Sequence, residues 1–166
     1  MTDWYVLRCL GQREAAASDR LMKAGHSTYL PICQHISRRG YKKTGYLYPG
    51  YLFLEKLPEA PWREILDVPG VIKALSLSAD GPPHPVPYGV IADLKRRENR
   101  AGVIVLRKPW LGMFERGDMV RVKDGPFVGF EGAILSEDDR VRVTVLLKFL
   151  GAEREIPLAI GDVEAA

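Results

Sequence analysis

The sequence predicts an α+β protein in two parts, an N-terminal α/β sandwich of the split βαβ type and a small closed β-barrel. Two observations lead to this fold class. Over residues 1–104, aromatic and β-branched segments alternate with helix-period segments in the order β-α-β-β-α-β-α. Over residues 115–166 the pattern has period two, with polar turns and no helix-period segment.

The first elements are a strand, a helix and a second strand. Residues 3–10 are rich in aromatic and β-branched side chains, which predicts a strand that Gly11 ends. Residues 12–23 carry apolar side chains on one helical face and predict a helix. The second strand, over residues 28–33, is expected to be irregular or at a sheet edge, because Pro31 has no N–H to donate.

A basic loop and an interrupted strand follow. Residues 38–45 carry four cations and two glycines, which indicates an exposed loop or hairpin tip. Residues 46–57 predict a strand interrupted by Pro49-Gly50, and Pro61 opens a short helix. A further strand is expected over residues 71–77.

A stiff, proline-rich connection leads to the last helix of the sandwich, predicted over residues 88–100 with a basic C-terminal end. Residues 101–113 are typical of a connection, although they contain an apolar patch at 103–106. The expected division of the chain is a domain over 1–104, a linker over 105–114 and the barrel over 115–166.

Alternating valines predict the barrel strands. Val120 and Val122 alternate with Arg121 and Lys123, and the pattern recurs at 141–147, where Arg142 and Thr144 take the polar positions. Strand propensity and alternation agree there, so a barrel is expected in the resting state rather than a helical hairpin. Closure removes the sheet edges that so small a domain would expose.

The stretch GPFVGFEG, residues 125–132, has two possible interpretations. Its glycines do not have the spacing of a phosphate-binding loop, no helix start follows, and residues 136–139 are polar and mostly acidic. A turn that closes the barrel explains the composition better: Gly125 can take a positive φ, and Gly132 suits a sharp bend or a close backbone approach.

The sequence gives no support for an enzyme. The three histidines are scattered, the two cysteines form no CxxC pair, and no nucleophile motif is present. We therefore expect no catalytic residues, no metal site and no cofactor. The chain also lacks a long apolar run and an N-terminal leader pattern, so a cytoplasmic location without membrane contact is expected.

Charge is unevenly distributed along the chain. Residues 1–108 hold 17 Lys+Arg against 10 Asp+Glu, whereas residues 109–166 hold 7 against 11. A basic first part suits a polyanion, and an acidic second part suits a different partner. Chance segregation is the alternative.

Four segments, in order, carry a family likeness: Trp4 to Leu7, the segment YPGYLF at 48–53, VPGV at 68–71, and GDMVRV at 117–122 followed by DGPF and Gly132. With these the chain resembles the NusG family of transcription elongation factors over nearly its whole length. The resemblance implies an NGN domain built as a sandwich and a KOW domain with an SH3-like barrel. Ala152, where an arginine is usual, and Lys148 depart from the family pattern.

The resemblance also implies partners. The NGN domain would bind the β′ clamp helices of RNA polymerase, and the KOW domain would recruit Rho or the NusE ribosomal protein. The chain is expected to act as a monomer. The expected polymerase-binding residues are Tyr5, Arg8, Tyr48, Pro49, Gly50, Tyr51 and Phe53. Of these, Tyr48 and Tyr51 are expected to be more exposed than Leu52 or Leu54.

Two further sites follow from the same reading. A possible contact with upstream or non-template DNA is expected at Arg38, Arg39, Lys42 and Lys43. The expected KOW partner contacts are Phe127, Phe130, Phe149, Leu150 and Gly151. Whether Rho or NusE is preferred stays open.

Two alternatives compete with a general elongation factor. An operon-specific, RfaH-like branch of the family would share the same two domains. A ribosome-associated or other RNA-binding KOW protein would explain the barrel and the basic half, but not the matches at Trp4 and 48–53.

Overall fold

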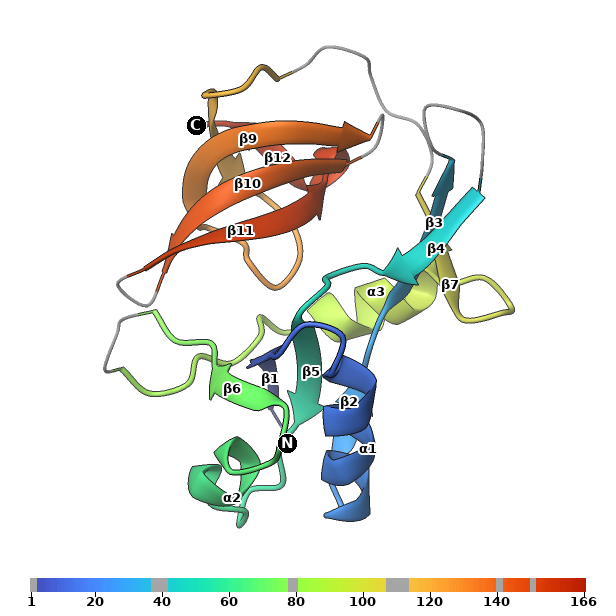
Figure 1. Cartoon of the computed structure of the whole chain (residues 1–166), viewed down its shortest axis with the longest axis vertical. Coiled ribbons are helices and arrows are strands. Elements are labelled where there is room, and N and C mark those ends of the chain that lie inside the picture. The colour runs from blue at the N-terminus through green and yellow to red at the C-terminus, as the bar shows by residue number, and fades with distance from the viewer. Residues whose placement is uncertain (1–2, 37–41, 78–80, 107–113, 140–141, 150–151) are drawn as a thin grey trace.

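A four-stranded antiparallel sheet forms the centre of the N-terminal domain (Figure 1). The computed structural model of the chain describes residues 3–36, 42–77, 81–106, 114–139, 142–149 and 152–166. The sheet has the order β2-β5-β1-β6, formed by β1 (Trp4–Cys9), β2 (Ser27–Tyr29), β5 (Tyr51–Glu55) and β6 (Val71–Ala74). The first strand thus lies between the third and the fourth of the sheet, which is the arrangement of a split βαβ sandwich. The predicted fold class of this part is confirmed.

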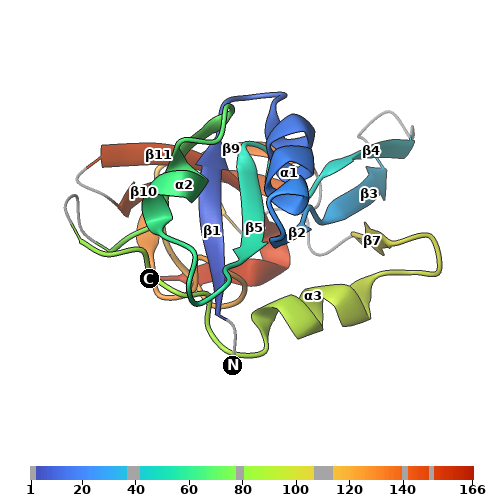
Figure 2. The ribbon, with the colours of Figure 1, turned by 90° about the horizontal axis from the view of Figure 1, so that it is seen from below.

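The two faces of this sheet carry different helices (Figure 2). Helices α1 (Glu14–Lys23) and α2 (Trp62–Leu66) pack with Leu7, Leu52 and Leu54 in one apolar cluster. Helix α3 (Val90–Arg97) contributes Ile91 and Leu94 to a second cluster, which contains Val6 and Phe53. Because side chains alternate along β1 and β5, each strand supplies both clusters.

A second, three-stranded sheet corrects two expectations about the connections. It consists of β4 (Lys42–Tyr46), β3 (Ile32–Ile36) and β7 (Val103–Val105) in that order. The strand expected over 28–33 is divided at Pro31 into β2 and β3, as a missing N–H would require. The apolar patch that was expected within a connection is β7, which pairs in parallel with β3 and buries Ile104 beside Cys33. The predicted loop 38–45 is in part the strand β4, and residues 37–41 lie outside the described residues.

The C-terminal domain is a five-stranded antiparallel barrel, as predicted. Its order is β11-β10-β9-β8-β12, with β8 (Met119–Val122), β9 (Glu131–Asp139), β10 (Arg142–Phe149), β11 (Ala152–Ala159) and β12 (Val163–Ala165). Val120, Val122, Val143, Val145 and Leu147 are all buried, so the valine alternation defines the interior. The expectation of a barrel in the resting state is confirmed.

Two glycines of the 125–132 stretch show why the barrel needs them. A Cβ on Gly132 would lie 2.1 Å from the Leu146 carbonyl oxygen, so β9 and β10 approach there more closely than any side chain allows. Gly125 has a φ of +88°, a conformation that side chains with a Cβ rarely adopt. The predictions of a tight turn and of a close backbone approach are both confirmed.

The barrel lies against the sandwich, and one apolar cluster runs through both. It includes Phe53 and Leu94 from the sandwich together with Phe127 and Val143 from the barrel. No described helix is long and apolar enough to cross a membrane. The division at 1–104, 105–114 and 115–166 stays a prediction, since residues 107–113 lie outside the described residues.

Candidate partner-binding face and domain interface

Three of the predicted polymerase-binding residues, Arg8 of β1 and Tyr51 and Phe53 of β5, lie on the sheet face that bears α3. Arg8 is paired in register with Tyr51, and Val6 with Phe53, so these four side chains share one face. Leu52 and Leu54 point to the other face, toward α1 and α2. We call Arg8, Tyr48, Tyr51 and Phe53 the aromatic face.

A tight turn fixes the start of this face. The Tyr51 N–H donates to the Tyr48 carbonyl at 3.1 Å, with Pro49 and Gly50 between them and a φ of +84° at Gly50. Proline followed by a glycine with positive φ is the arrangement of a type II turn. The Gly50 N–H also donates to Glu14 Oε1 at 2.6 Å, which ties the turn to α1.

The aromatic face is covered by the barrel. The Phe127 ring lies edge-on to both tyrosines, with centroid distances of 5.8 Å to Tyr48 and 5.4 Å to Tyr51. Tyr48 is 2% exposed and Tyr51 5%, against 0% for Leu52 and Leu54. The two tyrosines are slightly more exposed than the two leucines, as expected, but all four side chains are buried. The barrel covers the tyrosines, which were expected to be open to a partner.

Tyr5 lies apart from the other predicted residues. Its ring packs edge-on against Trp62 of α2, with centroids 4.7 Å apart. It precedes Val6 on β1 and so faces the α1 and α2 side of the sheet. The structure therefore brings Arg8, Tyr48, Tyr51 and Phe53 together but separates Tyr5 from them.

A buried arginine of the barrel enters the sandwich. Arg142 Nη2 donates to the Leu47 carbonyl at 2.6 Å, and Nη1 lies 3.8 Å from Cys33 Sγ. The residue is 9% exposed, its Nε has no hydrogen-bond partner, and no ion pair to a carboxylate is found among the described residues. A buried cation without a counter-charge is costly. The sequence pattern placed Arg142 on the polar side of its strand, and it could not show that this side faces another domain.

A second charged contact crosses the interface at Asp162. Its Oδ1 lies 4.0 Å from Arg97 Nη1 of α3, and its Oδ2 is buried without a partner. The pKa of Asp162 is raised to about 6, chiefly because burial disfavours the charged carboxylate; Arg97 and Lys123 lower the pKa, and the nearby Asp124 carboxylate raises it. Burial also raises the pKa of Tyr48. No alternation pattern marks Asp162, so sequence reasoning missed it.

The remaining predicted residues are only partly described. Lys42 and Lys43 are exposed on β4, whereas Arg38 and Arg39 lie outside the described residues. Phe127 is fully buried at the domain interface and Phe130 is half-buried against the same cluster. The Phe149 side chain, Leu150 and Gly151 lie outside the described part of the chain.

The described residues contain no group of three or more His, Cys, Asp or Glu side chains that could hold a metal ion. The pKa of Cys9 is raised to about 12, chiefly by burial and to a smaller extent by the nearby Glu14 carboxylate. That thiol is therefore protonated at neutral pH. The candidate site therefore consists of aromatic and charged side chains that both domains contribute.

The fold and this shared interface define a two-domain protein, in which a β-barrel packs on an α/β sandwich. Residues 2–95 match the family model described as "Transcription termination factor nusG", and residues 116–147 match the KOW motif model. The chain belongs to the NusG family. The family consists of transcription termination/antitermination factors and not of enzymes, and this chain is assigned to that class.

Two relatives in sequence support the same assignment. The transcription termination/antitermination protein NusG of Treponema pallidum is 36% identical, and the match covers 98% of each chain. That of Buchnera aphidicola is 26% identical, over 97% of this chain and 94% of the relative. A solved structure described as "Domain interaction in Thermotoga maritima NusG" is 23% identical, with a TM-score of 0.44 over 99% of this chain and 97% of that one.

Proposed function

We propose that this transcription factor binds RNA polymerase at the β′ clamp helices through its aromatic face. The observation that carries the proposal is the cluster of Tyr48, Tyr51 and Phe53 on one side of the sheet, beside Arg8. Aromatic and arginine side chains are enriched among residues that dominate binding energy. The tip of a coiled coil would present apolar and acidic side chains to such a face.

In this proposal the barrel and the polymerase compete for the same surface. Phe127 occupies the aromatic face in the free protein, so the barrel has to move before clamp helices can bind. Opening is favoured by the return of two buried charged groups, Arg142 and Asp162, to water. The same movement would free Phe127 and Phe130 for Rho or the NusE ribosomal protein.

A titration of a β′ clamp-helix fragment onto the full chain tests the proposal. Tyr51→Ala is expected to weaken binding at least tenfold, since it removes a central aromatic anchor worth about 2 kcal/mol or more. Tyr88→Ala is the matched control, because Tyr88 is 97% exposed and lies outside the aromatic face.

Two outcomes would contradict polymerase binding through this face. One is the absence of binding by the parent protein at micromolar concentration, which would favour a ribosome-associated role. The other is tighter binding of the Tyr51→Ala protein, which would mean that Tyr51 only holds the barrel.

A contact with DNA backbone at Lys42 and Lys43 is a second part of the proposal. Both side chains are exposed on β4, and cations on an exposed strand attract phosphates without reading sequence.

Mapping polymerase-associated occupancy along the genome distinguishes a general factor from an operon-specific, RfaH-like one. A cytoplasmic location fits either role.

A further inference from the structure

Asp162 is a buried carboxyl at the contact between the two domains. It ends the short 3₁₀ helix η1 (Ile160–Asp162), which joins β11 to β12, and it is 6% exposed. Its Oδ2 has no hydrogen-bond partner, and its Oδ1 lies 4.0 Å from Nη1 of Arg97. A carboxylate without close partners is costly to bury, whereas a neutral carboxyl costs much less. The closed arrangement of the domains therefore suits the protonated form of this group.

The backbone of Asp162 holds the loop that covers the aromatic face. The Lys123 N–H donates to the Asp162 carbonyl at 2.9 Å. Lys123 follows β8 directly and begins the loop that carries Phe127, whose ring lies on the aromatic face. The state of the carboxyl therefore acts where the barrel covers the proposed polymerase site.

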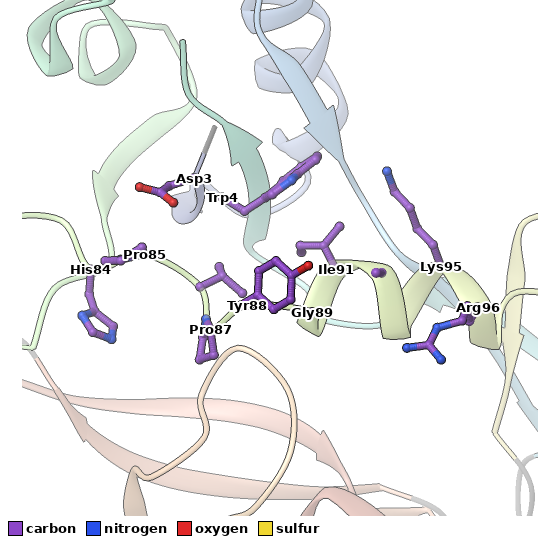
Figure 3. Close-up of a pocket in the computed structure, with 12 residues that line it drawn as sticks. Asp3, Trp4, His84, Pro85, Pro87, Tyr88, Gly89, Ile91, Lys95 and Arg96 are labelled. Atoms are coloured by element: carbon purple, nitrogen blue, oxygen red, sulfur yellow. The ribbon is translucent and has the colours of Figure 1, made fainter. Parts of the chain in front are cut away.

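The cations at the end of α3 have different contacts. Lys95 and Arg96 border the pocket drawn in Figure 3, and Arg96 pairs with Asp93 within the helix. Arg97 instead reaches the barrel at Asp162, and its side chain is 38% exposed. A single long contact from a partly exposed guanidinium compensates the buried charge only in part.

The other groups around Asp162 leave the closed protein with the higher proton affinity. Burial is the main reason that the pKa of Asp162 is raised, to about 6 against 3.8 for an ordinary carboxyl. Arg97 and Lys123 lower this pKa, and the Asp124 carboxylate raises it. Tyr48 lies near Asp162 on the sandwich side, and it stays neutral at these pH values because burial raises its pKa. In an open protein the carboxyl returns to water, where it regains an ordinary proton affinity.

We propose that protonation of Asp162 closes the barrel onto the sandwich, so that mild acidification masks the aromatic face and ionisation of the carboxyl favours opening. The device lies between α3 and the turn after β11, outside the aromatic face itself. Its consequence for polymerase binding rests on the proposed function, whereas the closure itself is a property of the free protein.

Energy transfer between dyes on cysteines introduced at Met22 and Met119 tests the closure. The two side chains are about half exposed and lie in different domains. Single-molecule measurements at pH 5 and pH 7 give the ratio of closed to open protein. The ratio is expected to rise about tenfold from pH 7 to pH 5, because the closed state takes up the proton and the open state does not.

Two variants assign this response to the carboxyl. Asp162→Asn carries a neutral amide, so its ratio is expected to change less than twofold between the two pH values. Arg97→Gln removes a cation that favours the ionised carboxyl, so the midpoint of the response should move to higher pH. Asp67→Asn is the matched control, because Asp67 is an exposed carboxyl that follows α2. It is expected to respond like the parent.

The three histidines also titrate in this range, so the measure is the difference between the parent and Asp162→Asn. Equal responses of these two proteins overturn the proposal. So does a ratio in the parent that is the same at both pH values or falls on acidification.

A titration with the clamp-helix fragment separates closure from polymerase binding. The parent is expected to bind more weakly at pH 5 than at pH 7, and Asp162→Asn to bind equally at both. If the fragment fails to bind the parent at either pH, the proposed function is wrong, and the energy-transfer ratios still decide whether Asp162 closes the domains.

Discussion

At the scale of single residues, Gly132 is the position where the barrel tolerates no side chain. The Leu146 carbonyl oxygen occupies the place of a Cβ, at 2.1 Å, and it belongs to backbone that is paired in the sheet. Gly132→Ala is therefore expected to destabilise the protein by about 3 kcal/mol or more.

Urea unfolding monitored by circular dichroism measures this loss. Gly161→Ala is the matched control, because a Cβ there meets no atom within 4 Å and no positive φ is required. The close approach at Gly132 would be contradicted if both variants unfolded at the same urea concentration.

Asp162 is the residue whose environment predicts a pH dependence. Its pKa in the folded protein is about 6, against 3.8 for an ordinary carboxyl, so the folded state binds the proton more tightly than the unfolded state. Ionisation of this group therefore costs stability as pH rises from about 4 to 6, and the full cost is present above pH 6.

Asp162→Asn removes that cost. Relative to the parent, the variant is expected to gain up to roughly 3 kcal/mol of unfolding free energy between pH 4 and pH 7. Urea titrations of both proteins at several pH values give the difference, in which the contributions of other carboxyls cancel. A difference that stays constant with pH would show that Asp162 is solvated.

At the scale of elements, the loop between β8 and β9 covers the aromatic face. Phe127 contacts both tyrosines and is fully buried. Phe127→Ala removes this lid and is expected to raise the affinity for the clamp-helix fragment, while it lowers the unfolding free energy by about 3–5 kcal/mol.

The comparison needs a variant that loses stability without uncovering the face. Ile65→Ala serves, since Ile65 is buried with α1 and α2 on the other side of the sheet. Binding that increases equally in both variants would reflect general loosening and not removal of the lid. Unchanged binding in Phe127→Ala would contradict competition for the face.

At the scale of the whole molecule, the proposed function requires two arrangements of the same domains. Fluorescence energy transfer between cysteines introduced at the exposed positions Ser27 and Gly161 reports their separation. The free protein is expected to give one population, and the clamp-helix fragment a second population with weaker transfer.

The native thiols favour this design, because Cys9 and Cys33 are both buried and react slowly. A fragment that binds without changing the transfer would show that the polymerase site lies elsewhere on the molecule.

The sequence by itself determined the fold class of each domain and most of the elements, but not β4 or β7. Period-two valines define the barrel interior, the Pro49-Gly50 pair interrupts the strand pattern of 46–57, and Gly132 marks a sharp bend or a close backbone approach, because each is a local requirement of the backbone. The four family segments were likewise enough to identify the family.

Only the tertiary structure decided what each face meets. Tyr48 and Tyr51 became core residues because Phe127 lies on them, and Arg142 became buried although its strand pattern marks it as polar. Tyr5 lies on the opposite face of β1 from Arg8, as the pairing of β1 with β5 shows. Residues 103–105 form a strand because they pair with β3. These outcomes depend on contacts between residues far apart in the chain, whereas periodicity reports only on neighbours.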